Sequence, residues 1–123
     1  MNEFTKEIFD ILVRVLPSDW GKIVLRVFVG PNSQMTSLFV QDSVLKKYYS
    51  YVDLVKMGLF TKQEYQSSCI QIGKVSREHQ KSFEKPWTGY TLLIARDGKV
   101  DINYEYDPPS TGIPEEWINR YLK

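Results

Sequence analysis

Residues 90–106 read YTLLIARDGKVDINYEY, and this stretch decides the fold. Two runs rich in β-branched and aromatic residues, 90–95 and 100–106, flank a turn that contains Asp97 and Gly98. Asp-Gly between two such runs is a strong signal for a β-hairpin, and we expect both turn residues to have positive φ. The second run alternates apolar and polar residues, which predicts a strand with one face packed and the other facing water or a partner. The apolar face holds Val100, Ile102, Tyr104 and Tyr106, and the polar face holds Asp101, Asn103, Glu105 and Asp107.

A long amphipathic helix is expected before this hairpin. The segment Thr61–Glu64 has the spacing of a capping box, in which the hydroxyl and the carboxylate each accept from the other residue's free amide. Apolar and small residues then recur every three or four positions as far as Phe83, so one face of the helix should pack on the sheet. The helix must end before Pro86, and we expect Trp87 to anchor the start of the hairpin. The packed stripe consists of Tyr65, Cys69, Ile72, Ser76, His79 and Phe83.

The N-terminal segment also has the pattern of an amphipathic helix. Asn2 or Thr5 is suited to cap it, and Pro17 ends it. Its apolar residues recur at helical spacing and predict a buried face. They are Phe4, Ile8, Ile11, Leu12 and Val15.

The region between the two helices contains the remaining strands. The runs Ile23–Val29 and Met35–Gln41 read as strands joined by a turn at Gly30–Ser33. The stretch Val44–Leu54 is ambiguous, although its tyrosines favour a third strand. After the hairpin, Pro114 suits the first turn of a short terminal helix.

These elements predict an α+β fold. We expect an antiparallel sheet of about five strands with an N-terminal helix, one long helix packed on the sheet and a short C-terminal helix. A length of 123 residues with 42% hydrophobic residues is enough for one core and too little for two. We therefore expect a single domain spanning residues 1–123.

The composition also bounds the possible partners and the compartment. A net charge of +1 argues against a dedicated nucleic-acid binder, which usually carries a clear basic excess. Charged residues interrupt the first sixteen positions, so we expect neither a signal peptide nor a membrane span. We therefore expect a cytoplasmic protein that binds neither membranes nor nucleic acid directly, and the sequence leaves its oligomeric state open.

The residues that usually carry catalysis are scarce. The chain has one histidine and one cysteine, and ten residues on one helix separate Cys69 from His79 by about 15 Å of rise. That distance is too long for a nucleophile and its base, so we interpret His79 as a hydrogen-bonded residue at the core boundary and Cys69 as a small buried hydrophobe. No glycine-rich phosphate loop occurs, and one histidine with one cysteine does not make a metal cluster. We expect no enzyme activity, no metal and no cofactor.

Two surface patterns have both a structural and a functional interpretation. The segment Lys46–Tyr51 interleaves lysines with tyrosines, as platforms for single-stranded nucleic acid do, but the near-neutral chain favours a strand with packed tyrosines. The polar stripe of the last strand is either a solvated face or an acidic ridge for a cationic partner surface. Its side chains point along parallel lines, which disfavours a metal site.

Three segments resemble the YezG-like immunity (antitoxin) family of bacterial polymorphic toxin systems. Residues 85–92, KPWTGYTL, and 97–107, DGKVDINYEYD, are similar to the family's PWT-like start, apolar strand, DGK turn and acidic-aromatic strand ending in YD. Residues 16–22, LPSDWGK, resemble the family's turn between the first helix and the first strand. The tail after Asp107 matches no motif of the family.

The resemblance implies an immunity protein that binds the C-terminal toxic domain of a cognate toxin, often a nuclease, and occludes it stoichiometrically. The alternatives are an adaptor or regulatory domain for another protein, and a small-molecule or nucleic-acid binding domain. The partner-binding residues that we predict are Asp101, Asn103, Glu105, Asp107 and Trp117.

Overall fold

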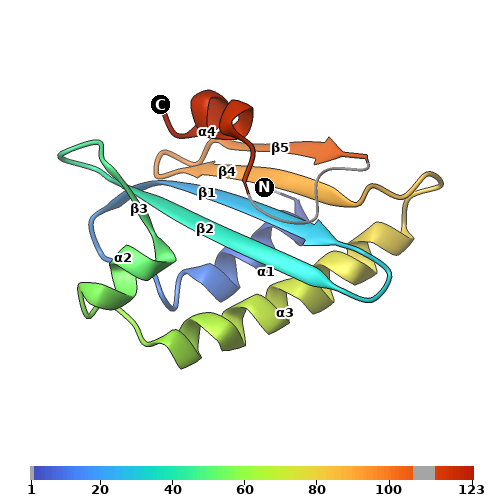
Figure 1. Ribbon diagram of the computed structural model, residues 1–123, viewed down its shortest axis with the longest axis horizontal. Helices are drawn as coiled ribbons and strands as arrows, with labels where there is room; N and C mark the ends of the chain where they lie inside the picture. Colours follow the sequence, from blue (N-terminus) through green and yellow to red (C-terminus); the bar gives the residue numbers. More distant parts are fainter. Residues whose placement is uncertain (1, 107–112) are drawn as a thin grey trace.

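One antiparallel sheet with helices on both sides forms the protein (Figure 1). The structure is a computed structural model that describes residues 2–106 and 113–123. The five strands pair in the order β3-β2-β1-β4-β5, which confirms the α+β fold expected from the sequence. In chain order the elements are α1 (Glu3–Leu12), β1 (Trp20–Val29), β2 (Gln34–Asp42), β3 (Tyr48–Ser50), α2 (Tyr51–Lys56), α3 (Lys62–Lys81), β4 (Gly89–Ala95), β5 (Val100–Glu105) and α4 (Glu115–Tyr121).

Strand β1 lies at the centre of the sheet. Leu25 pairs with Leu38 of β2 on one side and with Leu92 of β4 on the other. Val24 and Leu25 point to opposite faces, and both are fully buried. The strand is therefore covered from above and below, which explains its nearly continuous apolar run.

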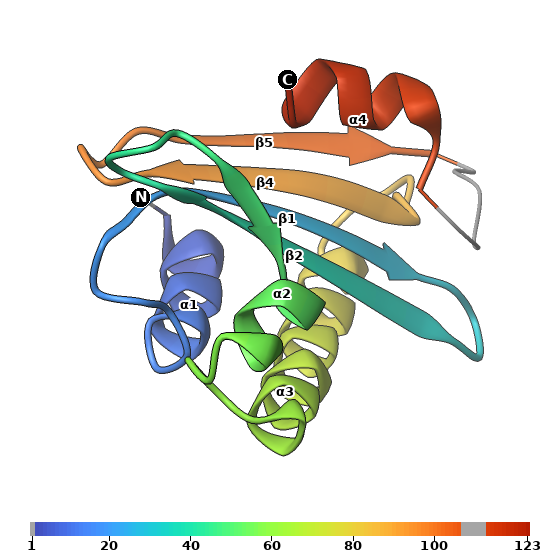
Figure 2. The same ribbon diagram turned by 60° about the vertical axis from the view of Figure 1, so that its left-hand side comes forward.

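Helices α1, α2 and α3 lie on one face of the sheet and α4 lies on the other (Figures 1 and 2). Helices α1, α2 and α3 enclose the main core, to which β1, β2, β4 and β5 contribute one apolar face each. Helix α4 lies on the opposite face, where Trp117 and Tyr121 form a smaller apolar cluster with Val24. None of the helices in the described part of the chain is long and apolar enough to cross a membrane.

The two main helices begin where the sequence predicts. The Asn2 side chain accepts a hydrogen bond from the Thr5 amide at 2.8 Å and caps α1. At the start of α3, the Glu64 amide donates to the Thr61 hydroxyl (3.1 Å) and the Thr61 amide donates to the Glu64 carboxylate (2.9 Å). This reciprocal pair confirms the predicted capping box.

The prediction of a third strand over residues 44–54 is only partly correct. The strand is limited to Tyr48–Ser50, and Tyr51 begins the six-residue helix α2. The reason is a second capping box, in which Ser50 and Asp53 accept each other's amide hydrogens (3.4 and 3.1 Å). These local bonds override the strand preference of the tyrosines.

The predicted hairpin is present, but its turn differs from the expected one. Gly98 has φ +99°, whereas Asp97 is not among the described residues with positive φ. Ala95 donates to the Lys99 carbonyl (2.8 Å) and accepts from the Gly98 amide (3.0 Å), which leaves a three-residue loop. In such loops only the last residue is left-handed, so one glycine is sufficient.

The apolar face of β5 packs as predicted for three of its four residues. Val100, Ile102 and Tyr104 lie against the main core, and fully buried Trp87 sits with its ring 5.3 Å from that of Tyr104. Tyr106 follows the last paired residue and is 50% exposed. The prediction was wrong for Tyr106 because the strand ends before it.

Candidate functional site

The polar face of β5 holds the stripe that we predicted to bind a partner. Asp101 is exposed, whereas Asn103 and Glu105 are partly covered and lie on the side of the sheet that carries α4. Asp107 lies outside the described residues. The structure therefore brings three of the predicted residues onto one face, with Asp101 the most accessible of them.

Two residues of this stripe already have partners within the chain. The Asn103 amide donates to the Tyr121 hydroxyl of α4 (3.2 Å). The Glu105 carboxylate lies 3.8 Å from the guanidinium of Arg26, a side chain with only 4% of its surface exposed. The Nε of Arg26 is buried and makes no hydrogen bond within the described residues, so Glu105 provides the main compensation for its charge.

Trp117, the fifth predicted residue, holds α4 on the sheet. It is 5% exposed, and its indole Nε1 donates to the Thr91 hydroxyl at 2.8 Å. Its ring also packs against Phe39, with ring centroids 5.6 Å apart. The buried ring positions the helix, and the role of the five residues in binding a partner stays a prediction.

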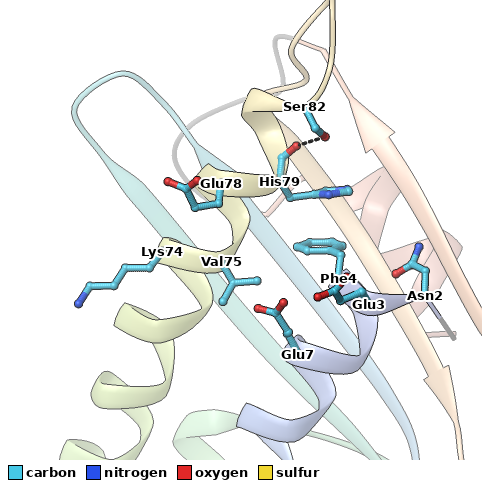
Figure 3. Close-up of a pocket in the computed structure, with 9 residues that line it drawn as sticks. All are labelled: Asn2, Glu3, Phe4, Glu7, Lys74, Val75, Glu78, His79 and Ser82. Carbon is cyan, nitrogen blue, oxygen red and sulfur yellow. Dashed lines mark hydrogen bonds between the residues drawn. The ribbon is translucent and has the colours of Figure 1, made fainter.

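A second candidate surface is an open groove between α1 and α3 (Figure 3). Its volume is about 710 Å³, and Phe4, Val75 and the ring of His79 give it an apolar floor. Three carboxylates and one ammonium group line the groove around this floor. They belong to Glu3, Glu7, Glu78 and Lys74. A groove of this kind suits the apolar stem and positive head of a lysine or arginine side chain from a partner.

His79 connects the groove to the main core. Its ring lies parallel to that of Phe4, with centroids 3.8 Å apart (Figure 3). Its Nε2 lies 2.7 Å from the Tyr104 hydroxyl. Burial lowers the pKa of His79, which favours the neutral ring. The predicted role as a hydrogen-bonded residue at the core boundary is confirmed.

The described residues offer few groups with catalytic chemistry. Cys69 is partly buried, and burial raises the pKa of its thiol, which disfavours the reactive thiolate. Across residues 2–106 and 113–123, no three His, Cys, Asp or Glu side chains are grouped so that they could hold a metal ion.

We did not predict this groove from the sequence. Glu3 and Glu7 are four residues apart, a spacing that places them on one face of α1. That spacing was the available signal. The approach of Glu78 comes from the packing of α3 beside α1, which no local pattern reveals.

The chain matches the sequence model of a known protein family. The model of the family described as "Immunity protein YezG-like" matches residues 1–112, which contain every element from α1 to β5. Helix α4 lies beyond the matched residues. No curated protein is significantly similar to the chain.

Proposed function

The chain belongs to the YezG-like immunity protein family, and we propose that it neutralises a cognate bacterial toxin by binding its toxic domain one to one. The mechanism is occlusion, in which the bound immunity protein keeps the toxin from its substrate without turnover. We place this action in the cytoplasm of the cell that produces the toxin.

The acidic lining of the α1–α3 groove is the observation that supports a nuclease as the target. Three carboxylates and one ammonium group line this groove, although the whole chain carries a net charge of +1. A domain that cuts nucleic acid needs positive charge where phosphates bind. Complementary charge on an inhibitor speeds association with such a surface and favours the correct partner.

Co-expression tests the function directly. The partner to use is a candidate toxin domain, with any such domain encoded beside the gene for this chain tested first. We expect growth to be restored when both proteins are made, and titration calorimetry of the purified pair to give one immunity protein per toxin domain. Continued toxicity with soluble immunity protein present would refute the proposal for that toxin.

Charge reversal distinguishes the two acidic surfaces. We expect Glu7→Lys, in the groove, to weaken binding at least tenfold, about 1.4 kcal/mol. Asp10→Lys is the matched control because Asp10 is exposed on the same helix and does not line the groove. Asp101→Lys tests the β5 stripe without disturbing the pair of Glu105 with Arg26. Weakening by Asp101→Lys alone would assign the interface to the stripe.

A further inference from the structure

Exposed apolar side chains of the β2–β3 turn and of the α2–α3 connection line one hollow of the surface. Both segments lie at the left-hand end of the molecule in Figure 1. Val44 and Leu45 at the tip of the turn are 78% and 72% exposed. Met57 and Leu59 of the connection are 54% and 44% exposed. All four line one hollow of about 320 Å³, which has Leu54 among its other lining residues. Concentrated apolar exposure of this kind marks a site of protein interaction.

The turn that carries Val44 and Leu45 is fixed by local hydrogen bonds. The Asp42 carboxylate accepts from the amides of Val44 (3.3 Å) and Leu45 (2.5 Å). The Lys46 amide donates to the Asp42 carbonyl (3.1 Å), while Lys46 itself has φ +58°. A left-handed lysine is unfavourable by itself, so these bonds hold the turn in a conformation that presents both apolar side chains. A preformed surface loses little conformational entropy on binding.

The charged side chains in the lining of the hollow have one sign. Asp19 and Asp42 contribute to the lining, and no lysine or arginine is among the described residues that form it. The amide hydrogen bond from Leu45 is the largest influence on Asp42 and lowers the pKa of its carboxyl, which therefore stays ionised at neutral pH. An apolar group with a positive charge beside it matches this chemistry.

We propose that the hollow receives an aliphatic or aromatic side chain of the toxin, flanked by a lysine or arginine that faces Asp19 and Asp42. This inference rests on the proposed function and adds a contact to it. The hollow shares no lining residue with the α1–α3 groove. It would add an apolar anchor separate from the groove, since a few buried anchor residues carry most of the binding energy of an interface.

The chemistry of the hollow can be tested on the isolated protein. The probes are 2-phenylethylammonium and 3-phenylpropionate, which resemble each other in shape and carry opposite charges. Titration followed by methyl NMR should move the signals of Leu45, Leu54 and Met57 and leave that of Ile70, an exposed residue of α3, unchanged. We expect the ammonium probe to bind at least threefold more tightly, and Asp19→Asn to reduce this preference. Scattered shifts, or equal binding of both probes, would overturn the inference.

A second experiment measures the binding of variants to the toxin itself. We expect Leu45→Ser to weaken toxin binding at least tenfold, about 1.4 kcal/mol. Leu45 is largely exposed, so its replacement should leave the melting temperature unchanged. Ile70→Ser is the control because Ile70 is 56% exposed and does not line the hollow.

The possible outcomes separate the two proposals. If the wild-type protein neutralises the toxin and Leu45→Ser binds equally well, the proposed function stands and this inference is wrong. If the wild-type protein neutralises no toxin, the proposed function fails and the toxin is excluded as the occupant, while the probe titration still decides the chemistry of the hollow. A concentration-dependent dimer that Leu45→Ser abolishes would assign the hollow to a second copy and overturn the inference.

Discussion

The buried hydroxyl pair of Ser76 and Tyr90 makes a sharp prediction about stability. Both side chains are fully buried, and their oxygens lie 2.8 Å apart between α3 and β4. Ser76→Ala leaves the Tyr90 hydroxyl buried without this partner, which should cost about 1–3 kcal/mol. Tyr90→Phe should cost less, about 0.5–1.5 kcal/mol, because the remaining Ser76 hydroxyl can donate to the carbonyl of Ile72 one turn earlier.

The double variant is the decisive measurement. With both hydroxyls gone, no orphaned group remains, so we expect the combined loss to be smaller than the sum of the single losses by about 1 kcal/mol. Burial raises the pKa of Tyr90, so its hydroxyl stays protonated and ionisation does not enter the comparison. Urea unfolding followed by tryptophan fluorescence gives the four free energies.

Ser67→Ala serves as the control for this cycle. Ser67 is exposed on the same helix, and its hydroxyl accepts only a long, exposed hydrogen bond from the Gln71 side chain (3.5 Å). Its replacement therefore measures mainly the gain in helix propensity, about 0.5 kcal/mol. Strictly additive losses, or a milder effect of Ser76→Ala than of Tyr90→Phe after this correction, would refute the assignment of the pair as a coupled buried hydrogen bond.

Three further predictions concern other parts of the fold. Tyr104→Ala should lower the free energy of unfolding by about 3 kcal/mol, because it removes a ring that packs against the core. Asn103→Ala should lower it by about 1 kcal/mol, because it removes one hydrogen bond to Tyr121; urea unfolding of both variants measures the difference. Burial lowers the pKa of His79 below its ordinary 6.5, so the unfolded chain takes up a proton first as the pH falls. Stability should therefore decrease below about pH 6.5, and His79→Gln should reduce this slope in unfolding measured at pH 5 and 7.5. Trp117→Ala should speed amide hydrogen exchange in α4 at least tenfold and leave the exchange of α3 unchanged, because Trp117 packs α4 on the face of the sheet opposite α3.

Local patterns predicted most of the elements. The alternation of β5, the period of α3 and its Thr61–Glu64 cap each depend on neighbours in the sequence, and the structure confirms all three. Helix α2 was not predicted, because six residues are too few to show a helical period in the sequence. The Ser50–Asp53 capping box was the local signal for it.

The layer formed by α4 and the candidate surfaces depend on tertiary packing. The apolar run Ile23–Leu25 was a signal that β1 is covered on both faces, since a half-exposed strand alternates. It did not reveal which segment covers the second face. The groove and the hollow each combine segments that are distant in the sequence, so no spacing of residues predicts either as a whole. The spacing of Glu3 and Glu7 indicates only one side of the groove.

The central position of β1 has a consequence for synthesis on the ribosome. Its pairing with β2 needs only a short turn. Its pairing with β4, in which Lys22 lies opposite Ala95 and Phe28 opposite Gly89, forms only after α2 and α3 have been synthesised. Until β4 emerges, one edge of an almost entirely apolar strand has no partner. Such an edge is a site for aggregation, and distant strand pairing is slow. A nascent chain interrupted between α3 and β4 should therefore depend on chaperones until the second hairpin is complete.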